Sequence, residues 1–210
     1  MPNGLLSGDG LDSTDDEGPS FASLFMHGGG PFTFDSTGSV DHNGATPTLT
    51  PDGDLSIVVA RTHGAENGIA DLVAPIDSLV GVFLGDTRPD FSSAPGRLDF
   101  SPSGLGTDFL TLSPALKQPF FIGDGFTPAG VRQRFIAPAG ATRLYLGTMD
   151  RAGWSNNTGA FHVLMTPTPG PVLLGAVAGV AWIARRRRGN APNSARLGAV
   201  ATGVLKAATE

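Results

Sequence analysis

Short apolar runs separated by turn residues dominate the middle of this chain. Residues 55–60 are apolar and β-branched, and residues 79–84 form an apolar run that suits a strand buried on both faces. Residues 131–136 alternate apolar and polar side chains at period two, as a half-buried strand does. Further strands are expected at 31–34, 119–122, 143–147 and 159–165, and 21–26 is either a strand or a short helix.

No amphipathic helix interrupts this series of strands, so the pattern predicts an all-β fold. We expect an antiparallel, jelly-roll-like β-sandwich followed by a C-terminal transmembrane or sorting helix. The expected organisation is a disordered acidic N-terminus at 1–20, a β-sandwich domain at 21–165, a Pro-rich spacer at 166–171, a short transmembrane helix with an Arg cluster at 172–188, and a polar, weakly helical tail at 189–210.

The C-terminal apolar run is short for a membrane span. Residues 172–184 are 13 apolar residues, or about 20 Å of helix against a hydrocarbon core of roughly 30 Å. Residues 166–171 and the snorkelling stems of Arg185–Arg188 bring the segment nearer to spanning. The alternative is a buried core helix with a solvated basic end, but a Pro-rich spacer leaves little core for such a helix to pack against.

Three consecutive features of this region resemble the PEP-CTERM sorting signal of bacteria. Pro169, Gly170 and Pro171 match its tripeptide with Gly in place of Glu, residues 172–184 match its helix, and Arg185, Arg186, Arg187 and Arg188 match its basic cluster. The resemblance implies export, processing by an exosortase-type membrane protease, and delivery to the cell surface or matrix. Residues 1–20 lack the basic and apolar run of a secretory leader, so the true start lies upstream of Met1, the N-terminus was lost, or export takes another route.

Charge is distributed unevenly along the chain. Residues 1–165 carry 18 acidic and 8 basic side chains, whereas residues 166–210 carry 1 acidic and 6 basic ones. Nucleic-acid phosphates would repel the acidic part, so nucleic acid is an unsuitable partner, whereas Ca²⁺ is a compatible one. The basic part suits a cytoplasmic flank of a membrane segment. Cysteine is absent, which excludes disulfides and thiolate metal sites.

The loop between the last two strands of the domain carries the candidate chemistry. Asp150, Asn156 and Asn157 offer carboxylate and amide oxygens beside the flexible Gly153, and Ca²⁺ prefers oxygen ligands of this kind. Asp and Asn are also ordinary turn residues, so a plain hairpin turn is the alternative. The chain has no HExxH, GxSxG or P-loop pattern and only three Glu, so we expect no enzymatic activity.

Residues 143–163 resemble the C-terminal part of the galactophilic lectins of the PA-I type, which are Ca²⁺-dependent jelly-roll proteins. The resemblance implies that Asp150, Asn156 and Asn157 are metal ligands, with a main-chain oxygen from Gly153 or Trp154 and another near Ala65. It further implies that Asp150 and Asn156 contact the sugar. His63 and Glu66 are the nearest candidates for other sugar contacts, and Trp154 either stacks on a sugar ring or packs on the sheet.

The sequence therefore supports two hypotheses. The first is an envelope-anchored protein that binds carbohydrate with Ca²⁺ in exopolysaccharide or surface glycan. The second is a structural cell-surface or matrix protein in which the loop binds Ca²⁺ for rigidity or binds nothing.

Overall fold

The computed structural model describes residues 24–25, 30–168 and 201–206. This part of the chain consists of short strands and two single-turn 3₁₀ helices, so the predicted all-β class is confirmed. Residues 1–20 and the proposed sorting segment at 169–188 lie outside the described residues.

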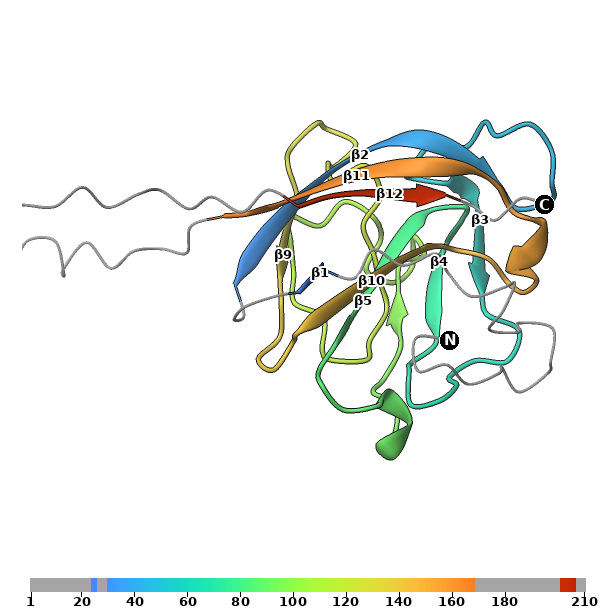
Figure 1. Ribbon diagram of the computed structural model, residues 1–210. Coiled ribbons are helices and arrows are strands. Elements are labelled where there is room, and N and C mark those ends of the chain that lie inside the picture. The colour runs from blue at the N-terminus through green and yellow to red at the C-terminus, as the bar shows by residue number, and fades with distance from the viewer. Residues whose placement is uncertain (1–23, 26–29, 169–200, 207–210) are drawn as a thin grey trace, which may run out of the picture.

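The strands form three sheets (Figure 1). Sheet A has the order β1-β10-β5-β8, with bounds Leu24–Phe25, Arg143–Thr148, Leu79–Leu84 and Phe120–Phe121. Sheet B has the order β12-β11-β2-β9-β7, with bounds Ala201–Lys206, Thr158–Pro167, Pro31–Asp41, Arg134–Ile136 and Thr111–Leu112. Sheet C has the order β3-β4-β6, with bounds Asp54–Ala60, Leu72–Ile76 and Leu98–Asp99. Pairing is antiparallel except between β7 and β9 and between β4 and β6.

The pair β2–β11 is the longest ladder and leads directly to the candidate site. It runs antiparallel from Thr158 opposite Asp41 to Pro167 opposite Phe32. We expected a strand only at 31–34, but β2 continues to Asp41 because its polar second half is paired along its whole length with β11. At the end of this ladder where Asp41 is opposite Thr158, the loop after β2 lies beside the loop before β11.

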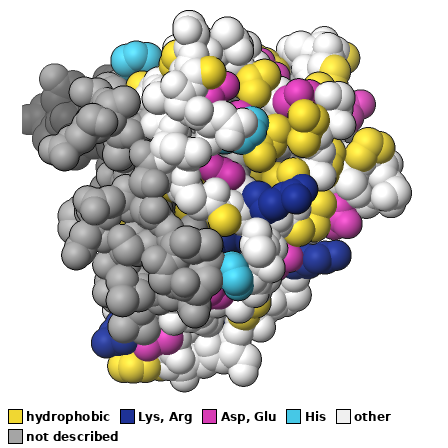
Figure 2. Space-filling model, turned by 90° about the vertical axis from the view of Figure 1, so that its right-hand side faces the viewer, with side chains coloured by type: hydrophobic (Ala, Val, Ile, Leu, Met, Phe, Trp, Pro, Cys, Tyr) yellow, Lys and Arg dark blue, Asp and Glu magenta, His cyan; other side chains and the backbone are white. Residues whose placement is uncertain are grey.

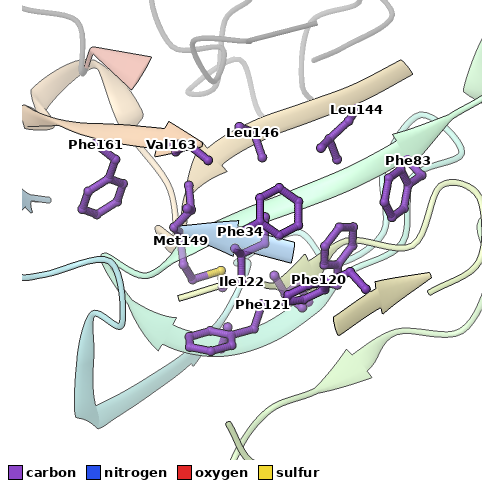
Figure 3. Packing of buried hydrophobic residues seen from close by; sticks show 14 of the residues in the cluster. Phe34, Phe83, Phe120, Phe121, Ile122, Leu144, Leu146, Met149, Phe161 and Val163 are labelled. Atoms are coloured by element: carbon purple, nitrogen blue, oxygen red, sulfur yellow. The ribbon is translucent and has the colours of Figure 1, made fainter. Parts of the chain in front are cut away.

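Phenylalanine fills the core between the sheets (Figure 3). Phe34 of β2 meets Phe135 of β9 edge to face, with ring centroids 5.0 Å apart. Phe83 of β5 stacks on Phe120 of β8, also at 5.0 Å. Leu79, in β5, is fully buried, and the burial of both faces predicted for that strand is confirmed. Strands of all three sheets therefore share one core.

A lysine ties down the loop that follows β5. Lys117 has a positive φ of 65°, and its ammonium group donates to the Ser92 hydroxyl at 2.7 Å and to the carbonyl oxygens of Ser92 and Ser93 at 3.0 and 2.6 Å. A further contact reaches the carbonyl oxygen of Pro89 at 3.4 Å. One ammonium group thus satisfies three main-chain carbonyl oxygens of this loop.

The C-terminal tail contributes an unexpected element. Residues 201–206 form β12 at the edge of sheet B, where the sequence suggested a weak helix.

Candidate functional site

Two loops and one turn meet at the end of the molecule that lies at the right of Figure 1. They are the loop after β2, the turn between β4 and β5, and the loop between β10 and β11. Figure 2 looks onto this end and shows histidine, acidic and basic side chains lying among hydrophobic ones. The candidate residues Asp150, Asn156 and Asn157 belong to the third of these segments.

Local hydrogen bonds shape the loop between β10 and β11. Asp150 is 3% exposed, and its Oδ1 accepts the main-chain N–H groups of Arg151 at 2.5 Å and Ala152 at 3.4 Å. Gly153 then takes a φ of 81°, which the lack of a Cβ permits, and opens the 3₁₀ turn Trp154–Asn156. This reversal returns the chain to β11, so that Asn157 comes back towards Asp150.

Four oxygen atoms converge around the Asn157 amide. In the orientation that satisfies both of its polar atoms, the nitrogen donates to Oδ2 of Asp150 at 2.9 Å, to Oδ1 of Asn156 at 3.2 Å and to the carbonyl oxygen of His42 at 3.3 Å. The amide oxygen accepts from Oγ1 of Thr148 at 3.2 Å.

With its nitrogen towards the three oxygens, the Asn157 amide satisfies them as a hydrogen-bond donor. If the amide turned over, its oxygen would join them, and oxygens spaced about 3 Å apart match neighbouring ligands of an ion held at about 2.3–2.6 Å, the distance range of Ca²⁺. The donor set also fits, since it combines one carboxylate, two amides and a main-chain carbonyl. We call Asp150, Asn156, Asn157 and the His42 carbonyl the oxygen cluster.

A buried carboxylate lies behind this cluster. Asp77, in the β4–β5 turn, is 0% exposed, and its Oδ2 lies 2.6 Å from Nδ1 of His42. Its Oδ1 is buried without a hydrogen-bond partner. Burial raises the pKa of Asp77, and the hydrogen bond to His42 only partly offsets this. The pair fixes the His42 side chain and thereby the main-chain segment that contributes the carbonyl oxygen.

Charge accumulates at this end of the molecule. Burial raises the pKa of the Asp150 carboxyl, while the N–H groups of Arg151 and Ala152 lower it in part. Burial alone would lower the pKa of His42, but the hydrogen bond to Asp77 and the nearby carboxylates outweigh it, so the pKa is raised. Two buried carboxyl groups, Asp77 and Asp150, thus lie at this end of the molecule, and His42 pairs with the first.

The loop after β3 forms a rim beside the cluster. The N–H and hydroxyl of Thr62 donate to the carbonyl oxygen of Arg151 at 3.1 and 3.3 Å, which ties the turn that carries His63 to the Asp150 loop. Arg61 pairs with Glu66 at 2.8 Å, and its guanidinium lies 5.1 Å above the ring of Trp154.

Trp154 packs against the protein on one face. Besides the contact with Arg61, its Nε1 donates to the carbonyl oxygen of Thr148 at 3.0 Å. Of the two alternatives for Trp154, the structure therefore supports packing against the protein for that face of the ring.

The main-chain oxygens differ in part from those expected. The carbonyl oxygen beside Asn157 belongs to His42, whereas Ala65 is exposed in the rim and contributes none of the oxygens that meet at that amide. The carbonyl oxygens of Gly153 and Trp154 accept turn hydrogen bonds from Asn156 and Asn157 at 3.4 and 3.1 Å.

Comparisons with known proteins give no relatives for this chain: no family model, no curated protein and no solved structure matches it. In the part of the chain that the structure describes, no helix is long and apolar enough to cross a membrane. Among the same residues, no three side chains of His, Cys, Asp or Glu form a group that could hold a metal ion. The oxygen cluster is of another kind, because amide and main-chain oxygens supply most of its donors.

Proposed function

We propose that this protein is an envelope-anchored module that binds carbohydrate with the help of Ca²⁺. The observation that carries the proposal is that oxygen atoms of Asp150, Asn156 and the His42 main chain lie within 3.3 Å of one terminal atom of the Asn157 amide. A jelly-roll-like sandwich is the arrangement we propose for the sheets. The shared core of sheets A and B and their predominantly antiparallel pairing support it.

Each residue of the cluster has a distinct task in this function. Asp150 supplies the negative charge, while Asn156, Asn157 and His42 supply neutral oxygens. The Asx turn at Asp150 leaves Oδ2 pointing at the amides, because Oδ1 is engaged by main-chain N–H groups. Ca²⁺, when bound, supplies a centre to which sugar hydroxyls can add as further oxygen ligands. In this proposal, Asp150 and Asn156 also accept hydrogen bonds from those hydroxyls.

The rim gives the site a second set of polar groups. His63 lies next to Thr62, which is bonded to the Asp150 loop, so it belongs to the polar rim beside the cluster. The Arg61–Glu66 pair and Trp154 form a preorganised wall, because each holds the next in place. Preorganised polar and aromatic walls favour carbohydrate, whose rings present both hydroxyl and apolar faces.

Anchoring is proposed from the C-terminal sequence. Pro169–Gly170–Pro171, the apolar run 172–184 and Arg185–Arg188 support insertion into the membrane and processing by an exosortase-type protease. The protein body would then lie outside the cytoplasm, with exopolysaccharide or surface glycan as its ligand.

Calorimetric titration of the full-length protein with Ca²⁺, followed by glycan in the presence of Ca²⁺, tests the function. We expect saturable binding of about one ion per chain. Asp150→Asn and Asn156→Ala should both weaken the binding of Ca²⁺ and of glycan, whereas the matched control Asp86→Asn, which alters an exposed carboxylate, should leave both unchanged. Glycan binding that persists in EDTA contradicts the proposal. Ca²⁺ binding without any glycan favours the structural role instead.

A further inference from the structure

The outer edge of β11 is covered by a segment from the far C-terminus. Residues 201–206 pair antiparallel with residues 160–165, from Ala160 opposite Lys206 to Met165 opposite Ala201. On its other side β11 is paired with β2 along all ten of its residues. Without β12, then, β11 would be a long edge strand of sheet B (Figure 1).

A long open edge is a strong acceptor for another strand. Its unpaired N–H and C=O groups offer the main-chain ladder through which extended peptides add to sheets. The segment 201–206 suits this use, since it is short and carries the β-branched Thr202 and Val204. Charge supports the same pairing, because residues 166–210 carry 6 basic and 1 acidic side chains against 18 acidic and 8 basic ones in residues 1–165.

Membrane anchoring, however, moves this segment away from the edge. If residues 172–184 cross a bilayer with the protein body on one side, Arg185–Arg188 and everything beyond them lie on the other. Residues 189–200 would then have to recross the hydrocarbon as an extended polar chain to reach β11. Such a chain would leave its backbone groups unpaired in lipid, which excludes this path.

We propose that the β11 edge is a strand-accepting surface that residues 201–206 occupy in the unanchored chain and vacate when residues 172–184 enter a membrane. This rests on the anchoring part of the proposed function. The basic tail has two competing partners, the acidic protein body and an anionic lipid surface. When residues 201–206 are docked, they cover the β11 edge and keep the tail beside the protein body. When residues 172–184 are inserted in a membrane, the β11 edge is open.

The absence of cysteine makes this exchange directly measurable. His162 and Val204 are register partners, so the double variant His162→Cys/Val204→Cys in the full-length chain should form an intramolecular disulfide when oxidised with copper–phenanthroline and air. In this step two thiols lose two hydrogens to the oxidant, and mass spectrometry detects the loss. The matched control is His162→Cys/Leu205→Cys, because Leu205 is opposite Phe161 and belongs to the other face of the ladder.

Vesicles of phosphatidylethanolamine and phosphatidylglycerol provide the second state. Flotation with the vesicles and protection of Arg185–Arg188 from added trypsin identify the inserted chain. We expect the cross-link in solution, its loss in the inserted fraction, and no cross-link in the control. A chain that is cross-linked beforehand should stay sensitive to trypsin at the Arg cluster until a reductant is added.

Three results would overturn the proposal in distinguishable ways. A folded variant that fails to cross-link in solution excludes docking of 201–206 on β11. A cross-link that persists in the inserted, trypsin-protected chain shows that docking and insertion coexist, while leaving the anchor intact. A chain that cross-links but never enters vesicles excludes the membrane anchor and therefore the exchange. The calcium and glycan tests do not depend on this result.

Discussion

The substitution Asn157→Asp tests whether the oxygen cluster is assembled as described. It places a second carboxylate where the nearest oxygen of Asp150 lies 2.9 Å away. With charge centres roughly 4 Å apart and an effective dielectric constant of about 20, the repulsion is about 4 kcal/mol. Since one carboxylate can take up a proton instead, we expect a loss of about 3–4 kcal/mol at neutral pH without metal. For a domain of this size that is a fall in melting temperature of roughly 10 °C.

Calcium should reverse this loss, because the added charge strengthens an oxygen site for a divalent cation. The assay is a thermal melt of the wild type and Asn157→Asp in EDTA and in excess Ca²⁺. The control Ala129→Asp adds the same charge to an exposed turn and should change stability by less than about 0.5 kcal/mol. Equal destabilisation of Asn157→Asp with and without Ca²⁺, or no destabilisation in EDTA, would refute the convergence of oxygens on a cation.

Substitutions at three further positions test other parts of the structure. Phe135→Ala removes a fully buried ring and should lower the free energy of unfolding in urea by about 3–5 kcal/mol; a smaller loss would mean that the core is less tightly packed. Asp77→Ala should weaken Ca²⁺ binding about tenfold in calorimetry by releasing His42, while Asp77→Asn, which keeps an acceptor, should retain most of the affinity. Burial raises the pKa of Asp52, so its contribution to stability is full below pH 3.8 and is lost as pH rises through the raised pKa. The melting temperature of Asp52→Asn should therefore rise relative to that of the wild type between pH 3.8 and 7, and a constant difference in melting temperature would contradict this.

The sequence predicted best the strands that coincide with a continuous run of apolar side chains. β3 and β5 match the apolar runs at 55–60 and 79–84. In β5 local β-propensity and burial agree, whereas in β3 propensity alone gave the signal, since Leu55 and Ile57 are exposed. β4 was missed: Pro75 lies inside it, and proline normally argues against a strand. β7 has only two residues and exists because β9 lies beside it, so pairing across the fold rather than local sequence produces it.

The candidate site divides in the same way. Asp150, Asn156 and Asn157 lie within one loop, so the sequence could group them, and the structure brings them together. His42 and Asp77 come from distant segments that meet only through the β2–β11 ladder and the β4–β5 turn. A single His and a single Asp without a local motif gave no signal, so the sequence could not group His42 and Asp77 with the loop residues.

The hydrogen bonds that the Lys117 ammonium group donates to the loop around Ser92, here called the Lys117 clamp, have a consequence for reagents that modify amines. The chain holds only two lysines, Lys117 and Lys206. The first binds the loop around Ser92 through its ammonium group, and the second ends the strand that covers β11. Acylation or amine coupling at Lys117 would remove the charge that binds three carbonyl oxygens and a hydroxyl of the loop. Reactive esters should therefore loosen this loop, and the rate at which Lys117 is labelled should report how often the clamp opens.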